Sequence, residues 1–238
     1  YMKRNAITPS QAFLLRLDDN GEVVYSHLLE RDGQSVGLTI TACAAASDGG
    51  VMLAGTGFPQ PGVFSVKLDR GGVPQGGWVL DHNIYNRARD LKELPNGHFV
   101  YSGNEYVPND DLNRVHTTNS SDAMSQTDAG NHWIITELDP SGRAIRRGLY
   151  GDTVWGHNTD IVHVDGPPGE EGYLLSGHLQ EPIGPYKTSK LVLRVTEDLQ
   201  SVVWSRHLQG LPSYVRDHSS QGVERSTEGL VVVTGIAD

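Results

Sequence analysis

Short apolar stretches, many alternating with polar residues, run along most of the chain and are separated by Gly, Pro, Asn and Asp. Residues 63–68 and 191–195 are typical, with branched or aromatic side chains at a period of two, as in a β-strand with one buried face. No stretch keeps the 3.6-residue period of an amphipathic helix over three turns. The pattern therefore predicts an all-β protein.

The predicted strands recur in four units of similar layout. Each unit starts where an apolar strand meets a polar turn, and it ends at a glycine that closes a later strand. The four starts are Asp18, Asp69, Asp139 and Thr196, and the four closing glycines are Gly55, Gly103, Gly177 and Gly235. The separations within the units are 37, 34, 38 and 39 residues, whereas the junctions between units vary widely. A near-constant unit with one variable junction indicates a structural repeat.

Each unit contains four short predicted strands, and four-stranded units repeated about every 50 residues are typical of β-propeller blades. The motif Leu-Asp-x-x-Gly (residues 17–21 and 68–72), followed by Asp-Gly-Gly-x-x-x-x-Gly (residues 48–55), resembles β-propeller repeats of secreted or surface proteins of bacteria. The resemblance covers nearly all of the chain outside residues 104–130, although Val195 and Thr196 replace Leu-Asp in the fourth unit. It implies a fold and a secreted, periplasmic or cell-surface location, but not a function.

The order of the predicted strands suggests how a ring could close. With the strands of a blade named A to D from the central axis outward, the chain opens with a C–D pair and closes with an A–B pair. We therefore expect a single propeller domain over residues 1–238, with four blades of which one is shared between the two ends, and a loop insertion at 104–130. The alternative is that the four units belong to a longer propeller or a larger assembly.

Composition narrows the classes of function. The chain has 29 Asp and Glu against 19 Lys and Arg, and this excess of acidic residues argues against a nucleic-acid binder. Its apolar runs are shorter than the roughly 18 residues of a transmembrane helix, so no membrane span is predicted. A single cysteine, Cys43, excludes an intramolecular disulfide, and its small apolar neighbours predict that it is buried.

Loop lengths suggest which face binds a ligand. In a propeller the B–C and D–A connections share one face, and here that face carries the insertion 104–130 and the loop 178–188. Because functional residues concentrate on long loops over a rigid scaffold, we expect protein or carbohydrate to bind there. The D–A connections supply the candidate ligand-binding residues, which are His82, Asn86, Arg89, Asp90, His157, Asn158, Asp160, Arg216, Asp217 and His218. The three histidines could equally be solvated loop residues.

Asp90 and Asp160 occupy matching positions at the start of strand A, where they would face the axis. Two carboxylates there could hold a divalent cation such as calcium or provide acid–base chemistry. They could equally accept backbone N–H groups and connect neighbouring blades. The matching residues of the other units, Ala42 and Gly222, are small, so no four-fold ring of carboxylates is expected.

The motifs favour a binding protein over an enzyme. The sequence contains no Gly-x-Ser-x-Gly, His-Glu-x-x-His or phosphate-binding loop. A non-catalytic binding module is therefore the main hypothesis. The alternative is a hydrolase or lyase with a polar, cation-dependent site at the channel mouth, and a third hypothesis is an oligomer formed through unpaired edge strands.

Overall fold

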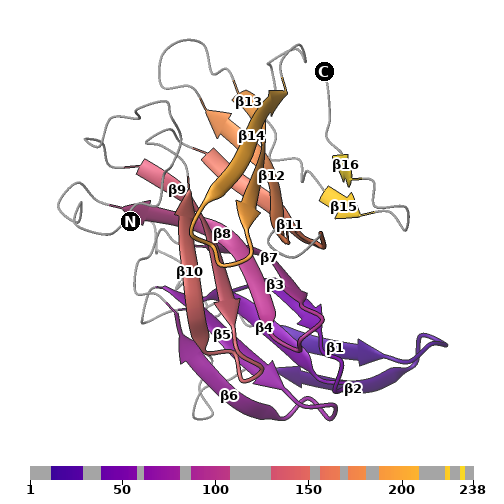
Figure 1. The fold of residues 1–238 in the computed structure, drawn as a ribbon. Helices are drawn as coiled ribbons and strands as arrows, with labels where there is room; N and C mark the ends of the chain where they lie inside the picture. Colours follow the sequence, from indigo (N-terminus) through magenta and orange to yellow (C-terminus); the bar gives the residue numbers. More distant parts are fainter. Residues whose placement is uncertain are drawn as a thin grey trace, which may run out of the picture.

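The structure is a computed structural model, and it describes residues 12–28, 39–57, 62–80, 87–107, 130–150, 156–166, 171–180, 188–208, 223–225 and 231–233. Throughout these residues the regular structure consists of β-strands (Figure 1). None of the described residues forms a helix that is long and apolar enough to cross a membrane.

The strands form three four-stranded sheets and two strand pairs, all antiparallel. In chain order they are β1 (Phe13–Leu17), β2 (Val23–Leu28), β3 (Thr39–Ala45), β4 (Val51–Thr56), β5 (Val63–Leu68), β6 (Pro74–Val79), β7 (Arg87–Glu93), β8 (Phe99–Val107), β9 (Gly130–Leu138), β10 (Ala144–Tyr150), β11 (Gly156–Val164), β12 (Gly172–Gln180), β13 (Thr188–Thr196), β14 (Val202–Leu208), β15 (Val223–Arg225) and β16 (Val231–Val233). The complete sheets are β3–β6, β7–β10 and β11–β14, and each pairs its strands in sequence order.

The three complete sheets are the blades of a β-propeller fold. Their first strands, β3, β7 and β11, contact one another in succession and therefore form the inner layer (Figure 1). Two apolar clusters fill the spaces between blades. One joins Met52 of β4 to Ile134 of β9, and the other joins Trp133 of β9 to Leu193 of β13. The all-β propeller fold expected from the sequence is thus confirmed.

The turns between the two outer strands share one hydrogen-bonded geometry. In the turn after β5, Oδ1 of Asp69 accepts the backbone N–H groups of Gly71 (2.8 Å) and Val73 (2.9 Å). Gly72 adopts a φ of 81°, which a residue without a Cβ tolerates easily. Asp18 and Asp139 cap their turns in the same way, so these aspartates have the structural role expected of turn residues.

The fourth turn keeps this geometry with different residues. Thr196 replaces the aspartate, and its hydroxyl accepts the backbone N–H of Ser201 at 3.1 Å. Leu199 stands where the other turns have glycine, and it is the only non-glycine residue with a positive φ (61°) among those described. The backbone carbonyl of Leu199 accepts the hydroxyl of Tyr150 from the preceding blade. The turn of the least conventional unit in the sequence therefore still joins the two outer strands of the complete blade β11–β14.

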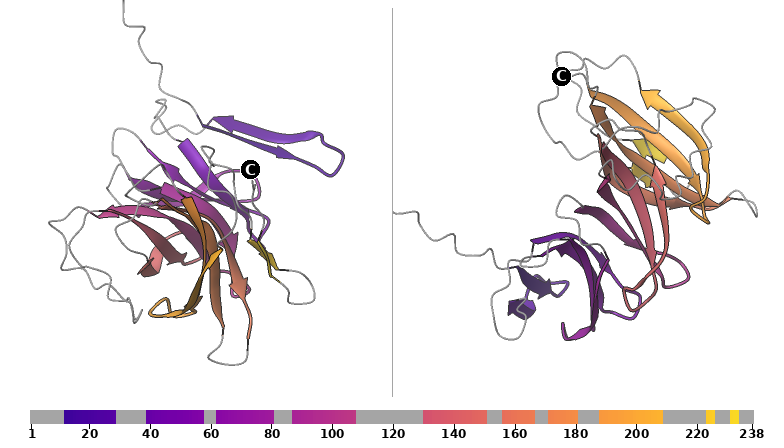
Figure 2. Two further views of the ribbon diagram at one scale, coloured as in Figure 1. Left: turned by 90° about the horizontal axis from the view of Figure 1, so that it is seen from above. Right: turned by 90° about the vertical axis from the view of Figure 1, so that its left-hand side faces the viewer.

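The two strand pairs at the ends do not share a blade. β1 pairs with β2 and β15 with β16, each as a separate two-stranded sheet, at opposite ends of the row of blades (Figure 2). Arg16 of β1 holds the first pair against blade β3–β6 by donating from Nη1 to the carbonyls of Gly49 and Arg70. β15 instead lies beside β11. Among the described residues of one copy, the two halves therefore form separate sheets and not the expected shared blade, and the number of blades in a closed ring stays a prediction.

Two smaller expectations also change. β8 and β9 pair as far as Val107 and Gly130, so residues 104–107 and 130 belong to strands and not to the expected insertion at 104–130, whose other residues lie outside the described ones. Cys43 is exposed rather than buried. It lies on β3, where the residues on its side of the strand face outward and Ala44 on the other side is buried.

Candidate functional site

The inner strands share an irregularity that positions the two aspartates predicted from the sequence. β3, β7 and β11 each contain a β-bulge at the same place, where Thr41, Arg89 and Thr159 are left without a partner across the ladder. The next residues are Ala42, Asp90 and Asp160. Because a bulge bends a strand and redirects its side chains, these three residues are equivalent in orientation.

The closing glycines of the repeat lie opposite the bulges. A Cβ on Gly103 would lie 2.1 Å from the carbonyl oxygen of Arg87, and one on Gly55 would lie 2.2 Å from that of Thr39. No side chain fits at such a distance from backbone atoms, so the second strand can approach the bulged inner strand only with glycine at this point.

Asp90 and Asp160 meet at the boundary between two blades. Each carboxylate accepts the backbone N–H of the following residue, Leu91 at 2.9 Å and Ile161 at 2.8 Å respectively. Oδ2 of Asp90 also accepts the N–H of Ile161 at 3.2 Å. Asp90 therefore connects β7 of one blade to β11 of the next.

Lys92 provides the positive charge of this cluster. Its Nζ lies 3.4 Å from Oδ2 of Asp90 and 3.1 Å from Oδ1 of Asp160. The three side chains are partly buried, with exposed fractions of 32% for Lys92, 23% for Asp90 and 13% for Asp160. Sequence reasoning missed Lys92, although it follows Asp90 by two residues and strand alternation places both on one face. Asp90, Lys92 and Asp160 are called the inner cluster below.

In the inner cluster, the two carboxylates both contact the ammonium group of Lys92. Burial, followed by the hydrogen bond and the negative charge of Asp160, raises the pKa of Asp90 to about 6. Lys92 and the N–H of Ile161 oppose this rise. Burial and the neighbouring Arg87 lower the pKa of Arg89, whose Nε is buried without a hydrogen-bond partner among the described residues.

The other predicted site residues divide into two groups. His157 and Asn158 lie on β11, but the structure does not describe their side chains. The remaining candidates fall outside the described residues, and these are His82, Asn86, Arg216, Asp217 and His218. Of the ten candidates, the structure thus shows that Arg89, Asp90 and Asp160 lie at or next to one boundary between blades.

Within the described ranges, no three His, Cys, Asp or Glu side chains gather into a group that could hold a metal ion. The Lys92 ammonium binds both aspartates and supplies positive charge of the kind that a bound cation would supply. The inner cluster can therefore join two blades and exchange a proton at Asp90.

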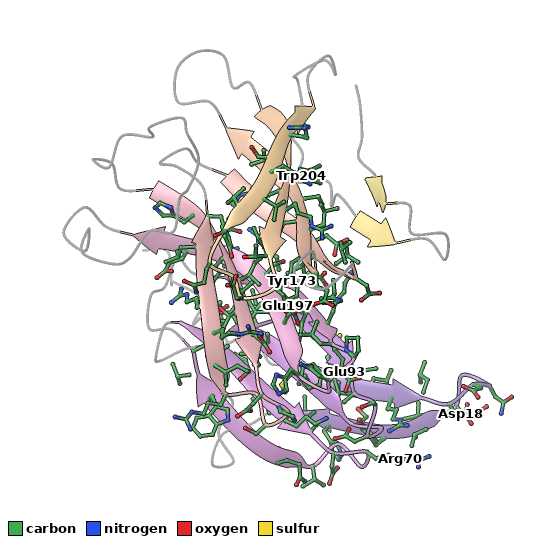
Figure 3. The ribbon with its side chains drawn as sticks, in the orientation of Figure 1. Asp18, Arg70, Glu93, Tyr173, Glu197 and Trp204 are labelled. Atoms are coloured by element: carbon green, nitrogen blue, oxygen red, sulfur yellow. The ribbon has the colours of Figure 1, made fainter. Side chains whose placement is uncertain are left out.

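A second boundary between blades uses a carboxylate in a related way. Glu93, labelled in Figure 3, lies at the end of β7. Ser47, in the turn after β3, donates its backbone N–H and its hydroxyl to the Glu93 carboxylate at 2.8–2.9 Å. Glu93 thus connects blade β3–β6 to blade β7–β10, as Asp90 connects the next two blades.

A deeper polar cluster lies inside blade β7–β10. The side chain of Glu137 on β9 is 1% exposed. Its Oε1 lies 2.7 Å from Nδ1 of His98, and its Oε2 accepts the Nε–H of Arg146 at 2.6 Å. Sequence reasoning missed this cluster, although Glu137 continues the alternation of the buried Trp133 and Ile135 and is thus a charged residue on a buried face.

Comparisons with known proteins add information about the fold. No protein-family model and no curated protein matches the chain. Among solved structures, a protein of unknown function from Bacteroides caccae is 12% identical, with a TM-score of 0.42 over 86% of this chain and 76% of that one. Quinohemoprotein alcohol dehydrogenase from Comamonas testosteroni, a β-propeller enzyme, is also 12% identical, with a TM-score of 0.50. That match covers 93% of this chain but 35% of the enzyme, and it supports the propeller fold alone.

Proposed function

We propose that this chain is a non-catalytic binding module that uses the loop-rich face of its propeller to recognise a carbohydrate or a protein. The proposal rests on the contacts that Asp90 and Asp160 make within the scaffold. Both accept backbone N–H groups, and both contact Lys92, at a boundary between blades. Carboxylates used in this way stabilise a scaffold, and the connections between strands are then the segments that contact a ligand.

The repeat resemblance supports a location outside the cytoplasm, at the cell surface, in the periplasm or in the medium. A rigid scaffold of three packed blades suits such a module, because it holds the connecting segments in a fixed arrangement.

Binding can be tested with an oligosaccharide microarray and a phage-displayed peptide library. We expect the chain to bind one of these probes reversibly and to release it chemically unchanged, as shown by mass spectrometry. A variant with residues 108–129 replaced by a short Gly-Ser linker should bind at least ten-fold more weakly. It should keep the melting temperature of the parent, because the β8–β9 ladder remains paired up to Val107 and Gly130.

The raised pKa of Asp90 favours one alternative, a hydrolase or lyase with its site at the inner cluster. A carboxyl group that keeps its proton near pH 6 beside a second carboxylate is an arrangement used for acid–base catalysis. This alternative predicts that a bound oligosaccharide is cleaved and that Asp90→Asn abolishes cleavage. Such a result, or the absence of binding to both probes, would contradict the proposed binding module.

A further inference from the structure

The pair β1–β2 has the geometry of the outer half of a blade. In the three complete blades, the third strand (β5, β9 or β13) pairs with the second strand on its inner side and with the fourth on its outer side. β1 occupies the third position and, among the described strands, pairs with β2 alone. One edge of β1 thus has no partner among the described strands, and an unpaired edge is a template for a further strand.

The exposed fractions of its apolar side chains show that the pair β1–β2 is not covered by a neighbouring blade on one face. Leu17 immediately precedes the turn aspartate, as do Leu68 and Leu138 in their blades. Leu68 and Leu138 are 0% exposed, whereas Leu17 is 49% exposed. Phe13 and Leu15, on the same face of β1, are also exposed. The row Phe13, Leu15 and Leu17 thus has the composition of a buried blade surface without the cover that the other blades have.

In the complete blades, the equivalent row packs against the blade before it in sequence. Ile134 and Leu138 of β9 join a cluster with Met52 and Ala54 of β4. Leu191, Leu193 and Val195 of β13 similarly join a cluster with Trp133 and Ile135 of β9. A partner that completes this half-blade must therefore supply two things: an inner strand pair for the edge of β1, and a preceding blade to cover the row Phe13, Leu15 and Leu17.

The other end of this same chain offers that combination. β15 and β16 form the inner half of a blade, with β15 beside the inner strand β11 of the last complete blade. β16 pairs with β15 alone among the described strands, so its outer side has no partner there. The two halves lie at opposite ends of one copy, with three blades between them (Figures 1 and 2).

The register of the complete blades predicts how the two halves would pair. In each blade the closing glycine lies opposite the residue five positions before the turn Asp or Thr. The observed pairs are Gly55 with Phe64, Gly103 with Ile134, and Gly177 with Leu191. The same register places Gly235 opposite Phe13, which sets Val233 opposite Leu15 and Val231 opposite Leu17.

We propose that β1 of one copy pairs with β16 of a second copy in this register, so that two half-blades form one shared blade. The preceding blade β11–β14 of the second copy then covers the row Phe13, Leu15 and Leu17. The contact is head-to-tail, and two copies joined reciprocally close into a ring of six complete and two shared blades.

Cysteine cross-linking tests the register and the origin of the partner strand together. In a Cys43→Ser background, Leu15→Cys and Val233→Cys are purified separately, mixed and oxidised. We expect a disulfide-linked species of twice the chain mass, because directly opposite Cβ atoms on paired strands lie about 4.5–5.5 Å apart. Leu15→Cys mixed with Ile145→Cys, an exposed position on the outer strand β10, is the matched control and should not cross-link.

A measurement of molecular mass tests the proposal independently, in case the disulfide does not form for geometric reasons. Light scattering should give twice the mass of one chain for the parent. The double variant Leu15→Lys, Leu17→Lys should give the mass of one chain with an unchanged β-sheet circular dichroism spectrum, because both residues are exposed in a single copy. Val73→Lys with Val79→Lys, two exposed positions next to and on β6, should leave the mass unchanged.

Two outcomes would overturn the proposal. One is a parent protein with the mass of a single chain and no mixed disulfide. The other is a disulfide that forms only within one chain of the Leu15→Cys, Val233→Cys double variant, because the two ends of a single copy would then close on each other.

Discussion

The two clusters of buried carboxylates differ in how their negative charge is balanced. Inside blade β7–β10, the single carboxylate of Glu137 has two partners, His98 and Arg146. At the boundary with the next blade, the carboxylates of Asp90 and Asp160 both contact the ammonium group of Lys92. The first cluster lies within one sheet, whereas the second joins two sheets.

The comparison shows where the molecule can respond to its surroundings. Glu137 is almost completely buried and bound on both oxygens, so the loss of its charge would leave Arg146 and His98 without their anion. In the inner cluster, burial and then the hydrogen bond and negative charge of Asp160 raise the pKa of Asp90 to about 6. We therefore expect the stability of blade β7–β10 to depend on whether Glu137 carries its charge. We expect the stability of the boundary at the inner cluster to change with pH.

The largest effect is expected from Glu137→Gln. The substitution removes the charge from the hydrogen bonds that the buried carboxylate makes with Arg146 and His98, and we expect the free energy of unfolding to fall by about 3 kcal/mol. Chemical denaturation at pH 7 would measure the change. The control is Glu22→Gln, at an exposed position, which should change stability by less than about 0.5 kcal/mol. Equal effects of the two substitutions would show that Glu137 is not the charge that stabilises this blade.

Asp90→Asn should remove one component of the pH dependence of stability. Because the pKa of Asp90 is raised in the folded state from 3.8 to about 6, its protonated form stabilises the fold fully below pH 4. That contribution is lost as the pH rises through 6, and we expect it to reach about 2 kcal/mol.

The difference between the parent and Asp90→Asn, measured by denaturation from pH 4 to pH 7, isolates this contribution from other titrating groups. Asp18 and Asp48 act in the opposite direction, because hydrogen bonds lower their pKa values, and they are present in both proteins. Parallel stability curves for the two proteins would exclude Asp90 as the responsive group.

Lys92→Gln should have the smallest effect of the three, because the lysine is partly exposed. At pH 7 the two carboxylates lose their shared cation, and we expect a loss of about 1 kcal/mol. The loss should shrink at pH 4.5, where Asp90 is mostly protonated. Lys92→Arg, which retains the charge, should stay close to the parent at both pH values. A loss from Lys92→Gln that did not depend on pH would separate Lys92 from the titration of Asp90.

The sequence predicted those parts of the structure that depend on local patterns. The blades, the turns capped by Asp18, Asp69 and Asp139, and the equivalent positions of Asp90 and Asp160 follow from strand alternation and repeat spacing. Lys92 and Glu137 were missed, although the same alternation placed each on a definite face. The pairing of the two half-blades could not be predicted from the sequence, because closure depends on how far each blade turns relative to the next. That angle is set by packing between sheets, such as Met52 against Ile134, and not by any local motif.

The contact between the bulged inner strand and its glycine has a consequence for how such a chain can change over generations. Gly103 and Arg87 fix the separation of the first two strands by backbone contact alone, as Gly55 and Thr39 do in the blade before. The fit needs no particular side chain from a neighbouring blade. A whole blade can therefore be duplicated, lost or exchanged as a genetic unit without redesign of its innermost joint, while the junctions between units drift in length.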